Sequence, residues 1–280
     1  MLESITPLLL TYNEAPNLGR TLAKLDWAKD IVVVDSGSTD ETLGILGRNP
    51  RVRVYPKAFE SFATQCNFGL EQISAPWVLS LDADYELSDE IIAEMSKLQP
   101  REENSGYRAS FVYRIFGKDL PGTLYPPRVV LYRPGRAQYH DEGHSHRVKI
   151  TGLVQPLRAA IYHDDRKPLA RWIASQQQYA RREAVYLLES NADALKLVDR
   201  LRLMAWPVPL LVFFYTMIWK RCLLSGRAGW FYVLQRTLAE VMLALEIIDR
   251  RASAQPSASE GPLANTTARP ITPDGHSPRG

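Results

Sequence analysis

The sequence has little cysteine and no leader-like segment. Cys66 and Cys222 are its only cysteines, they lie far apart, and no Cys-x-x-Cys pair occurs. This argues against a disulfide-stapled fold, and we expect a reducing compartment. The apolar stretch that follows Met1 is short and has no basic start, so we expect no signal peptide.

Several motifs of nucleotide binding and catalysis are also missing. There is no Walker lysine motif and no Gly-x-Gly-x-x-Gly after the first apolar run, which argues against P-loop hydrolysis and ordinary NAD binding. There is no Gly-x-Ser-x-Gly, so we do not expect a serine nucleophile. A net charge of +3 is too small to indicate nucleic-acid binding. No pattern indicates an oligomeric state.

What the first hundred residues do contain is an alternation of short apolar runs and helical patterns. Such alternation predicts an α/β fold with a mainly parallel, Rossmann-like sheet and right-handed crossovers. The continuous run at 31–34 is typical of a strand covered on both faces. We expect strands at 5–11, 31–35, 52–55 and 77–81, and helices at 15–25, after 36–41, at 62–73 and at 88–98.

Three of the four expected strands end in polar residues, at 11–14, at 35–38 and at Asp82-Ala83-Asp84. Ligands of parallel sheets collect at the carboxyl ends of the strands, so these residues predict one site. Two carboxylates at i and i+2 suit Mg²⁺ or Mn²⁺ with a diphosphate. The alternative is that they only cap helices.

The last third of the sequence becomes helical and then strongly apolar. Residues 203–219 are nearly all apolar but fall short of the ~20 residues of a membrane span, and Pro207 and Pro209 interrupt them. A second segment, 230–248, has helical apolar spacing with tryptophan and tyrosine nearby. We expect interfacial or re-entrant helices on a membrane surface. The alternatives are one true span, or helices that cover the protein's own core.

Three separated segments carry a family resemblance. LTYNE at 10–14, IVVVDSGSTD at 31–40 and LSLDAD at 79–84 closely resemble the family-two inverting glycosyltransferases. FESFATQCN at 59–67 resembles the Gln-x-Asn segment of the branch that builds lipopolysaccharide core and cell envelope. A looser resemblance continues through 125–128 and 132–133 to 161–163.

The resemblance implies a GT-A fold over residues 1–165. The residue patterns indicate a helical region with interfacial or re-entrant helices at 166–251, and composition indicates a disordered tail at 252–280. The resemblance further implies a nucleotide-sugar donor, expected to be a UDP-sugar, and Mg²⁺ or Mn²⁺. The expected acceptor is an envelope glycan or a lipid-linked glycan. The protein would then lie at the cytoplasmic face of a bacterial inner membrane, peripheral or re-entrant.

The resemblance also implies roles for single residues. For the donor and metal it points to Thr11, Tyr12 and Glu14 at the nucleoside, Asp35 at the base or ribose, Asp82 at the ribose or metal, Asp84 at the metal, and His163 at the metal or diphosphate. Arg128 would neutralise phosphate charge. An inverting transfer needs a general base, for which Asp141 and Glu142 are the candidates and Asp141 is preferred.

This branch often shows a His-Glu pair after the acidic pair, whereas this chain has His144-Ser145-His146-Arg147. Together with His140, these histidines allow a zinc site as an alternative, although no third ligand is set by spacing. For the whole protein two rival functions stay open. One is a nucleotidyltransferase that makes nucleotide sugars, and the other is a non-catalytic, membrane-associated module that binds them.

Overall fold

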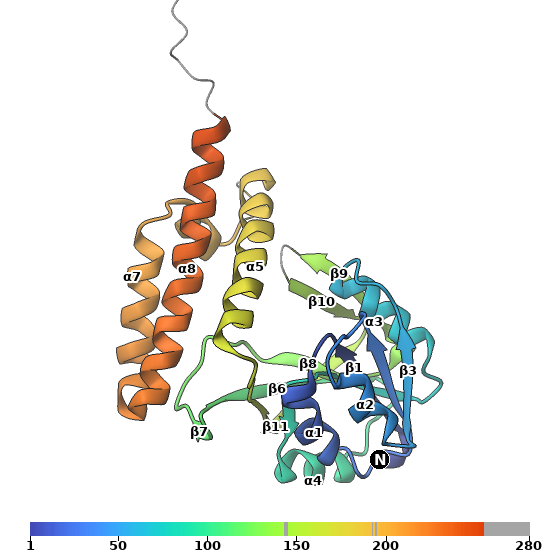
Figure 1. The fold of residues 1–280 in the computed structure, drawn as a ribbon. Coiled ribbons are helices and arrows are strands. Elements are labelled where there is room, and N and C mark those ends of the chain that lie inside the picture. The colour runs from blue at the N-terminus through green and yellow to red at the C-terminus, as the bar shows by residue number, and fades with distance from the viewer. Residues whose placement is uncertain (143–144, 192, 194, 255–280) are drawn as a thin grey trace, which may run out of the picture.

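The computed structural model describes residues 1–142, 145–191, 193 and 195–254, without the side chains of 141–147. The predicted α/β fold with a mainly parallel sheet is confirmed (Figure 1). The main sheet has the order β3-β2-β1-β4-β8-β6-β11-β5, with β7 on β6, and β9 and β10 form a separate hairpin. The strands are β1 (Ile5–Thr11), β2 (Ile31–Asp35), β3 (Val52–Pro56), β4 (Trp77–Asp82), β5 (Tyr85–Leu87), β6 (Asn104–Ile115), β7 (Lys118–Asp119), β8 (Arg128–Tyr132), β9 (Ala137–Glu142), β10 (Ser145–Ile150) and β11 (Leu153–His163).

Several helices begin at residues that stabilise a helix N-terminus, either a capping serine or a proline in the first turn. Ser61 and Ser88 each accept a hydrogen bond from a backbone N–H of the helix that follows, and Pro207 lies in the first turn of its helix. The helices are α1 (Ala15–Ala23), α2 (Thr42–Gly47), α3 (Phe62–Glu71), α4 (Asp89–Lys97), α5 (Leu169–Glu189), α6 (Leu197–Leu203), α7 (Pro207–Phe214) and α8 (Arg227–Ala254), with short helical turns η1 (Leu2–Ser4), η2 (Pro134–Arg136), η4 (Tyr215–Trp219) and η5 (Cys222–Ser225).

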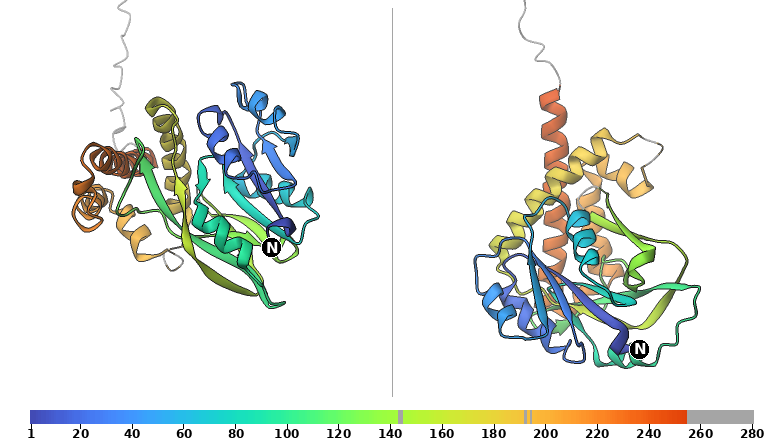
Figure 2. Two further views of the ribbon diagram at one scale, coloured as in Figure 1. Left: turned by 90° about the horizontal axis from the view of Figure 1, so that it is seen from below. Right: turned by 90° about the vertical axis from the view of Figure 1, so that its right-hand side faces the viewer.

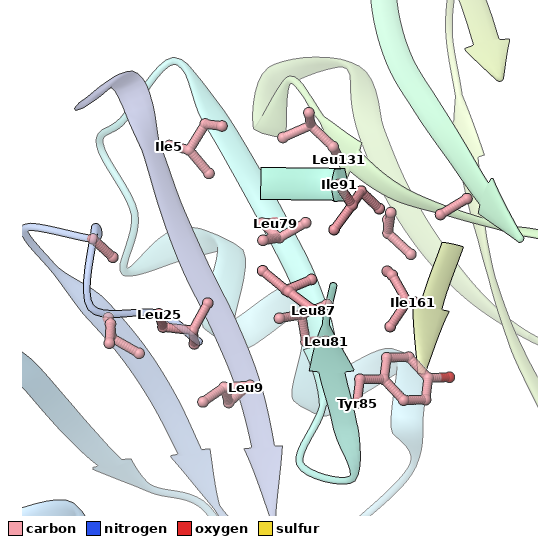
Figure 3. Packing of buried hydrophobic residues seen from close by; sticks show 14 of the residues in the cluster. Ile5, Leu9, Leu25, Leu79, Leu81, Tyr85, Leu87, Ile91, Leu131 and Ile161 are labelled. Carbon is pink, nitrogen blue, oxygen red and sulfur yellow. The ribbon is translucent and has the colours of Figure 1, made fainter. Parts of the chain in front are cut away.

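The central sheet is buried on both faces. Side chains of successive strand residues point to opposite faces, so Leu8 and Leu9, both buried, enter different hydrophobic clusters. Leu9 packs with Leu79 and Ile91 on the face covered by α1 and α4 (Figure 3). Leu8 belongs to the cluster on the other face, where α3 and β9 pack. Burial on both faces explains why the strands read as continuous apolar runs.

The C-terminal helices form a layer beside the sheet, in which α8 lies between α5 and α7 (Figures 1 and 2). Small residues of α5, Ala180 and Ala184, allow close packing on Leu243 and Ile247 of α8. The apolar run at 203–219 is not one helix. α6 ends at Leu203, α7 starts at Pro207, and η4 and η5 turn the chain back into α8.

Among the residues that the structure describes, no helix combines the length and the apolar character that crossing a bilayer requires. α8 continues to Ala254, and the predicted tail beyond it falls outside the described residues.

Candidate active site at the carboxyl edge of the sheet

The parallel strands bring the polar segments to one edge, as predicted. In the register of β1 with β2, Thr11 is paired with Asp35, and in the register of β1 with β4, Leu10 is paired with Asp82. The three strand ends therefore lie side by side at one height of the sheet. Residues 11–14, 35–38 and 82–84 share a single surface of the molecule.

Asp35 is buried and saturated with hydrogen bonds from its own neighbourhood. Its Oδ1 accepts from the hydroxyls of Thr11 (2.8 Å) and Ser38 (2.6 Å). Its Oδ2 accepts from the backbone N–H groups of Gly37 (3.0 Å) and Ser38 (2.8 Å). Gly37 has φ +88°, which favours glycine. Asp35 and Thr11 thus shape this loop, and their predicted contacts with a nucleoside remain predictions.

The loops after β1 and β2 are joined through Asn13. Its Oδ1 accepts from the backbone N–H of Thr39 at 2.6 Å, and its own φ of +55° lies in the left-handed region that asparagine tolerates. Arg171 of α5 donates to the carbonyl oxygens of Tyr12 and Asn13. Tyr12 is 53% exposed, and its ring centroid lies 5.8 Å from the Arg171 guanidinium. A stacking surface is therefore open beside a cation.

Asp84 meets His163, although 79 residues separate them, because β5 pairs with the end of β11. Tyr85 and His163 are partners in that ladder, and the Asp84 carbonyl accepts from the Asp164 N–H at 3.1 Å. The Asp84 Oδ2 lies 3.2 Å from His163 Nε2. Burial opposes ionisation of Asp84, but His163 and Lys167 outweigh it and hold the carboxyl pKa well below its usual range.

Lys167 is the central cation of the site. Its Nζ lies 2.8 Å from Glu14 Oε1, 3.5 Å from Asp165 Oδ1 and 3.8 Å from Asp84 Oδ2. Burial disfavours the ammonium, yet these carboxylates raise the pKa of Lys167 above its usual value. Burial raises the pKa of the Glu14 carboxyl, and this effect is larger than the lowering caused by the positive charge of Lys167. The Lys167 ammonium thus lies within 4 Å of three carboxylates, which come from three segments of the chain.

Three tyrosines surround the His163 ring. The ring centroids of Tyr113, Tyr125 and Tyr85 lie 4.3, 5.1 and 5.4 Å from that of His163. The hydroxyls of Tyr85 and Tyr125 share a hydrogen bond. Burial raises the phenol pKa of all three, so they are neutral at physiological pH. The cage fixes the imidazole against Asp84 without adding charge.

Arg128 reaches the site because β8 runs antiparallel to β4. Val78 pairs with Tyr132 and Leu79 with Leu131, so Arg128, the first residue of β8, lies toward the carboxyl end of β4, where Asp82 acts on its charge. The half-buried guanidinium lies 4.6 Å from the Tyr125 ring centroid. Burial disfavours the cation, but the surrounding tyrosines and Asp82 raise the pKa of Arg128. Arg128 therefore supplies a second fixed positive charge at this edge.

The candidate base lies on a strand that is firmly anchored. Asn67 of α3 exchanges two hydrogen bonds with the Tyr139 backbone, of 3.1 and 3.0 Å, and the Tyr139 hydroxyl donates to Ser80 at 3.0 Å. Asp141 and Glu142 are the last residues of β9, and their side chains fall outside the described ones, as do His144 and the side chain of His146. The choice of base and the zinc alternative therefore stay untested.

Sequence reasoning missed part of this site. It did not assign Lys167, although the charged string that follows His163 was a signal for it. It also missed Asn17, which is fully buried and bridges Glu14 (3.0 Å) and Asp165 (3.1 Å). Nothing in the spacing indicated the tyrosine cage, because Tyr85 and Tyr113 come from β5 and β6 and Tyr125 comes from the loop before β8.

A divalent cation suits part of this arrangement. Asp84 Oδ1 is buried and, among the described residues, has no hydrogen-bond partner, which leaves a carboxylate oxygen available to a cation. The His163 Nε2 is engaged with Asp84 instead of being open. The described residues contain no cluster of three or more histidine, cysteine or acidic side chains fit to hold a metal.

The fold and site together are of the α/β type, with charged side chains gathered at the carboxyl edge of a parallel sheet, where enzymes of this type bind their ligands. The chain belongs to the family described as Glycosyl transferase family 2, whose model matches residues 8–152. The predicted family is thereby confirmed, and the protein is a glycosyltransferase by family.

Two relatives illustrate the similarity. The lipopolysaccharide core biosynthesis glycosyltransferase LpsC of Rhizobium meliloti is 31% identical over 113 residues, which cover 38% of this chain and 41% of LpsC. The uncharacterized glycosyltransferase RC0292 of Rickettsia conorii is 30% identical over 204 residues, 68% of this chain and 72% of the relative. The match thus spans less than half of LpsC.

Solved structures with a similar arrangement share little sequence. TarS residues 1–349 of S. aureus, in complex with UDP-GlcNAc, is 14% identical, with a TM-score of 0.43 over 89% of this chain and 92% of that one. Glucosyl-3-phosphoglycerate synthase of Mycobacterium tuberculosis, with phosphoglyceric acid, is also 14% identical, with a TM-score of 0.46 over 68% and 82%.

Proposed function

We propose that this protein is a metal-dependent inverting glycosyltransferase that moves a sugar from a nucleotide-sugar donor, expected to be a UDP-sugar, to an envelope glycan or lipid-linked glycan. The observation that carries the proposal is the convergence of Glu14, Asp84 and Lys167 beside an exposed aromatic ring at the carboxyl edge of the sheet. Membership of the glycosyltransferase family supports the same activity.

The chain's own residues suit departure of a nucleoside diphosphate. In a single displacement the acceptor oxygen bonds to the anomeric carbon while the bond from that carbon to the diphosphate oxygen breaks. Negative charge then grows on the diphosphate, where fixed cations stabilise it. Lys167, ion-paired with Glu14, and Arg128, over the Tyr125 ring, are half-buried and charged before the reaction starts, so they need little reorganisation. Mg²⁺ or Mn²⁺, held by Asp84 and Asp82 with His163 behind them, would supply further charge neutralisation.

The acceptor proton must go to a base as the new bond forms. We propose Asp141, with Glu142 as the alternative, because both lie at the end of the anchored strand β9. The resemblance to LpsC supports an envelope acceptor. Because nucleotide sugars are cytoplasmic metabolites, the proposal places the reaction at the cytoplasmic face of a bacterial inner membrane.

Binding of UDP and GDP, measured by calorimetry with and without Mn²⁺, tests the proposal. We expect Mn²⁺ to tighten binding, and Asp84→Asn to remove that gain while leaving the weak metal-free binding. The control is Asp26→Asn, an exposed acid far from the site. Unchanged Mn²⁺-dependent affinity in Asp84→Asn would contradict the assignment. Release of pyrophosphate from UTP and a sugar 1-phosphate would favour a nucleotidyltransferase instead.

A further inference from the structure

The end of the α7–α8 hairpin carries an unusual set of exposed side chains. In Figure 1 this end lies at the lower left, near β7. Its apolar members are Ile218, Trp219, Leu223 and Leu224, whose exposed fractions are 66%, 77%, 52% and 76%. Arg221 and Arg227 lie among them and are also exposed. We call these six residues the hairpin tip.

The charge of this region has one sign. Residues 200–239 contain six arginines and lysines and no aspartate or glutamate. Arg202 is neutralised by Glu240 at 2.6 Å, whereas Arg221 and Arg227 form no ion pair with another described residue. A surface that joins exposed tryptophan and leucine to unpaired arginine matches a bilayer with anionic headgroups, where the apolar groups enter the interface and the cations meet phosphate.

The tip is connected to the candidate active site through the loop that precedes β8. A Cβ on Gly122 would lie 3.0 Å from the carbonyl oxygen of Lys220, so the loop closely contacts the residue between Trp219 and Arg221 of the tip. Two residues further on, the Leu124 N–H donates to the Tyr232 hydroxyl of α8 at 2.8 Å. Tyr125, next in the chain, belongs to the cage around His163. The tip is thus held at a fixed position relative to the site.

We propose that the hairpin tip docks this protein on an anionic lipid surface and so presents the site to acceptors at that surface. Docking needs neither donor nor metal, so it can be tested separately from the proposed transferase activity. Only the second part of the proposal, the presentation of the site to acceptors, rests on that activity. Because the four apolar side chains of the tip are more than half exposed and its two arginines are exposed, their replacement should leave the packed core unchanged.

The experiment is co-sedimentation of the full chain with vesicles of phosphatidylglycerol and phosphatidylethanolamine, and with vesicles of phosphatidylcholine alone. We expect binding to the anionic vesicles that weakens as salt rises. Trp219→Ser/Leu224→Ser and Arg221→Glu/Arg227→Glu should each reduce partitioning about tenfold or more. The matched control is Leu43→Ser/Leu153→Ser, which removes two leucines that are 46% and 45% exposed elsewhere on the surface.

Circular dichroism establishes that every variant is folded, and UDP binding with Mn²⁺ in solution should be the same in tip and control variants. Two results would overturn the proposal. One is equal vesicle binding by wild type, tip variants and control. The other is a wild-type dimer in light scattering that becomes monomeric in Trp219→Ser/Leu224→Ser, which would assign the tip to a second copy of the chain.

Discussion

Lys167 Nζ lies 2.8 Å from Glu14 Oε1, so a single ion pair joins the end of β1 to the segment that follows β11. Both side chains are mostly buried, with 17% and 12% of their surfaces exposed. The pair thereby couples the two halves of the catalytic sheet at the point where the proposed donor binds.

Removal of the buried ammonium should be costly. In Lys167→Met, Glu14 and Asp84 lose their shared cation, and breaking a buried ion pair costs about 3 kcal/mol or more. We expect that loss in the free energy of unfolding, measured in urea, together with weaker UDP binding. Lys149→Met, at an exposed position of β10, serves as the control and should be near neutral. A Lys167→Met protein as stable as wild type would contradict this role.

Asn67 should act on turnover through β9. It holds the Tyr139 backbone by two hydrogen bonds, and the candidate bases follow within three residues. Asn67→Ala should lower kcat about tenfold, which corresponds to about 1.4 kcal/mol, while the affinity for UDP stays unchanged. Steady-state kinetics and calorimetry on the same preparation measure both quantities. If binding and turnover fall together, Asn67 instead supports the donor site.

The hydrogen bonds of Asp35 should make that residue a stability determinant. Asp35→Asn replaces one acceptor oxygen with an amide NH₂ that faces existing donors, and we expect a loss of roughly 2–4 kcal/mol in the free energy of unfolding. Thr11→Val removes a single donor, the hydroxyl that bonds Asp35 Oδ1, and should cost about 1 kcal/mol. Urea denaturation compares the two variants. Similar losses would show that the carboxylate does not organise the loop.

Two glycines should respond in opposite directions to a methyl group. A Cβ on Gly69 of α3 would lie 2.5 Å from Leu8 Cδ1, so Gly69→Ala should overpack the core and cost about 1–3 kcal/mol. Gly19 of α1 is exposed and has nothing within 4 Å of such a Cβ, so Gly19→Ala should stabilise by about 0.5 kcal/mol. Thermal unfolding of both variants measures the contrast, and equal shifts would refute it.

The sequence was sufficient for the part of the fold that local patterns control. β1 and β2 were predicted with their observed ends because strands buried on both faces read as unbroken apolar runs. The shared edge followed from parallel pairing, which aligns the carboxyl ends of neighbouring strands. These arguments need only the order of elements along the chain.

The rest of the site depends on pairing between distant segments. Asp84 meets His163 only because β11 lies between β6 and the short strand β5, and no periodicity indicates that insertion. The same pairing brings Lys167, Tyr85 and Tyr113 to this position, whereas Tyr125 comes from the loop before β8. The broken hairpin at 203–225 was also unpredicted in detail, since prolines signal an interruption but not the direction that the chain takes afterwards.

The antiparallel insertion of β8 has one further consequence. Residues of a strand alternate between faces, so a shift of β8 by one residue against β4 would turn Arg128 to the opposite face of the sheet and remove its positive charge from the neighbourhood of Asp82. Changes in the length of the preceding loop, 120–127, are therefore tolerable only if they leave that alignment untouched. Homologues that vary there should gain or lose residues in the loop alone, with the first arginine of the strand still facing the aspartate.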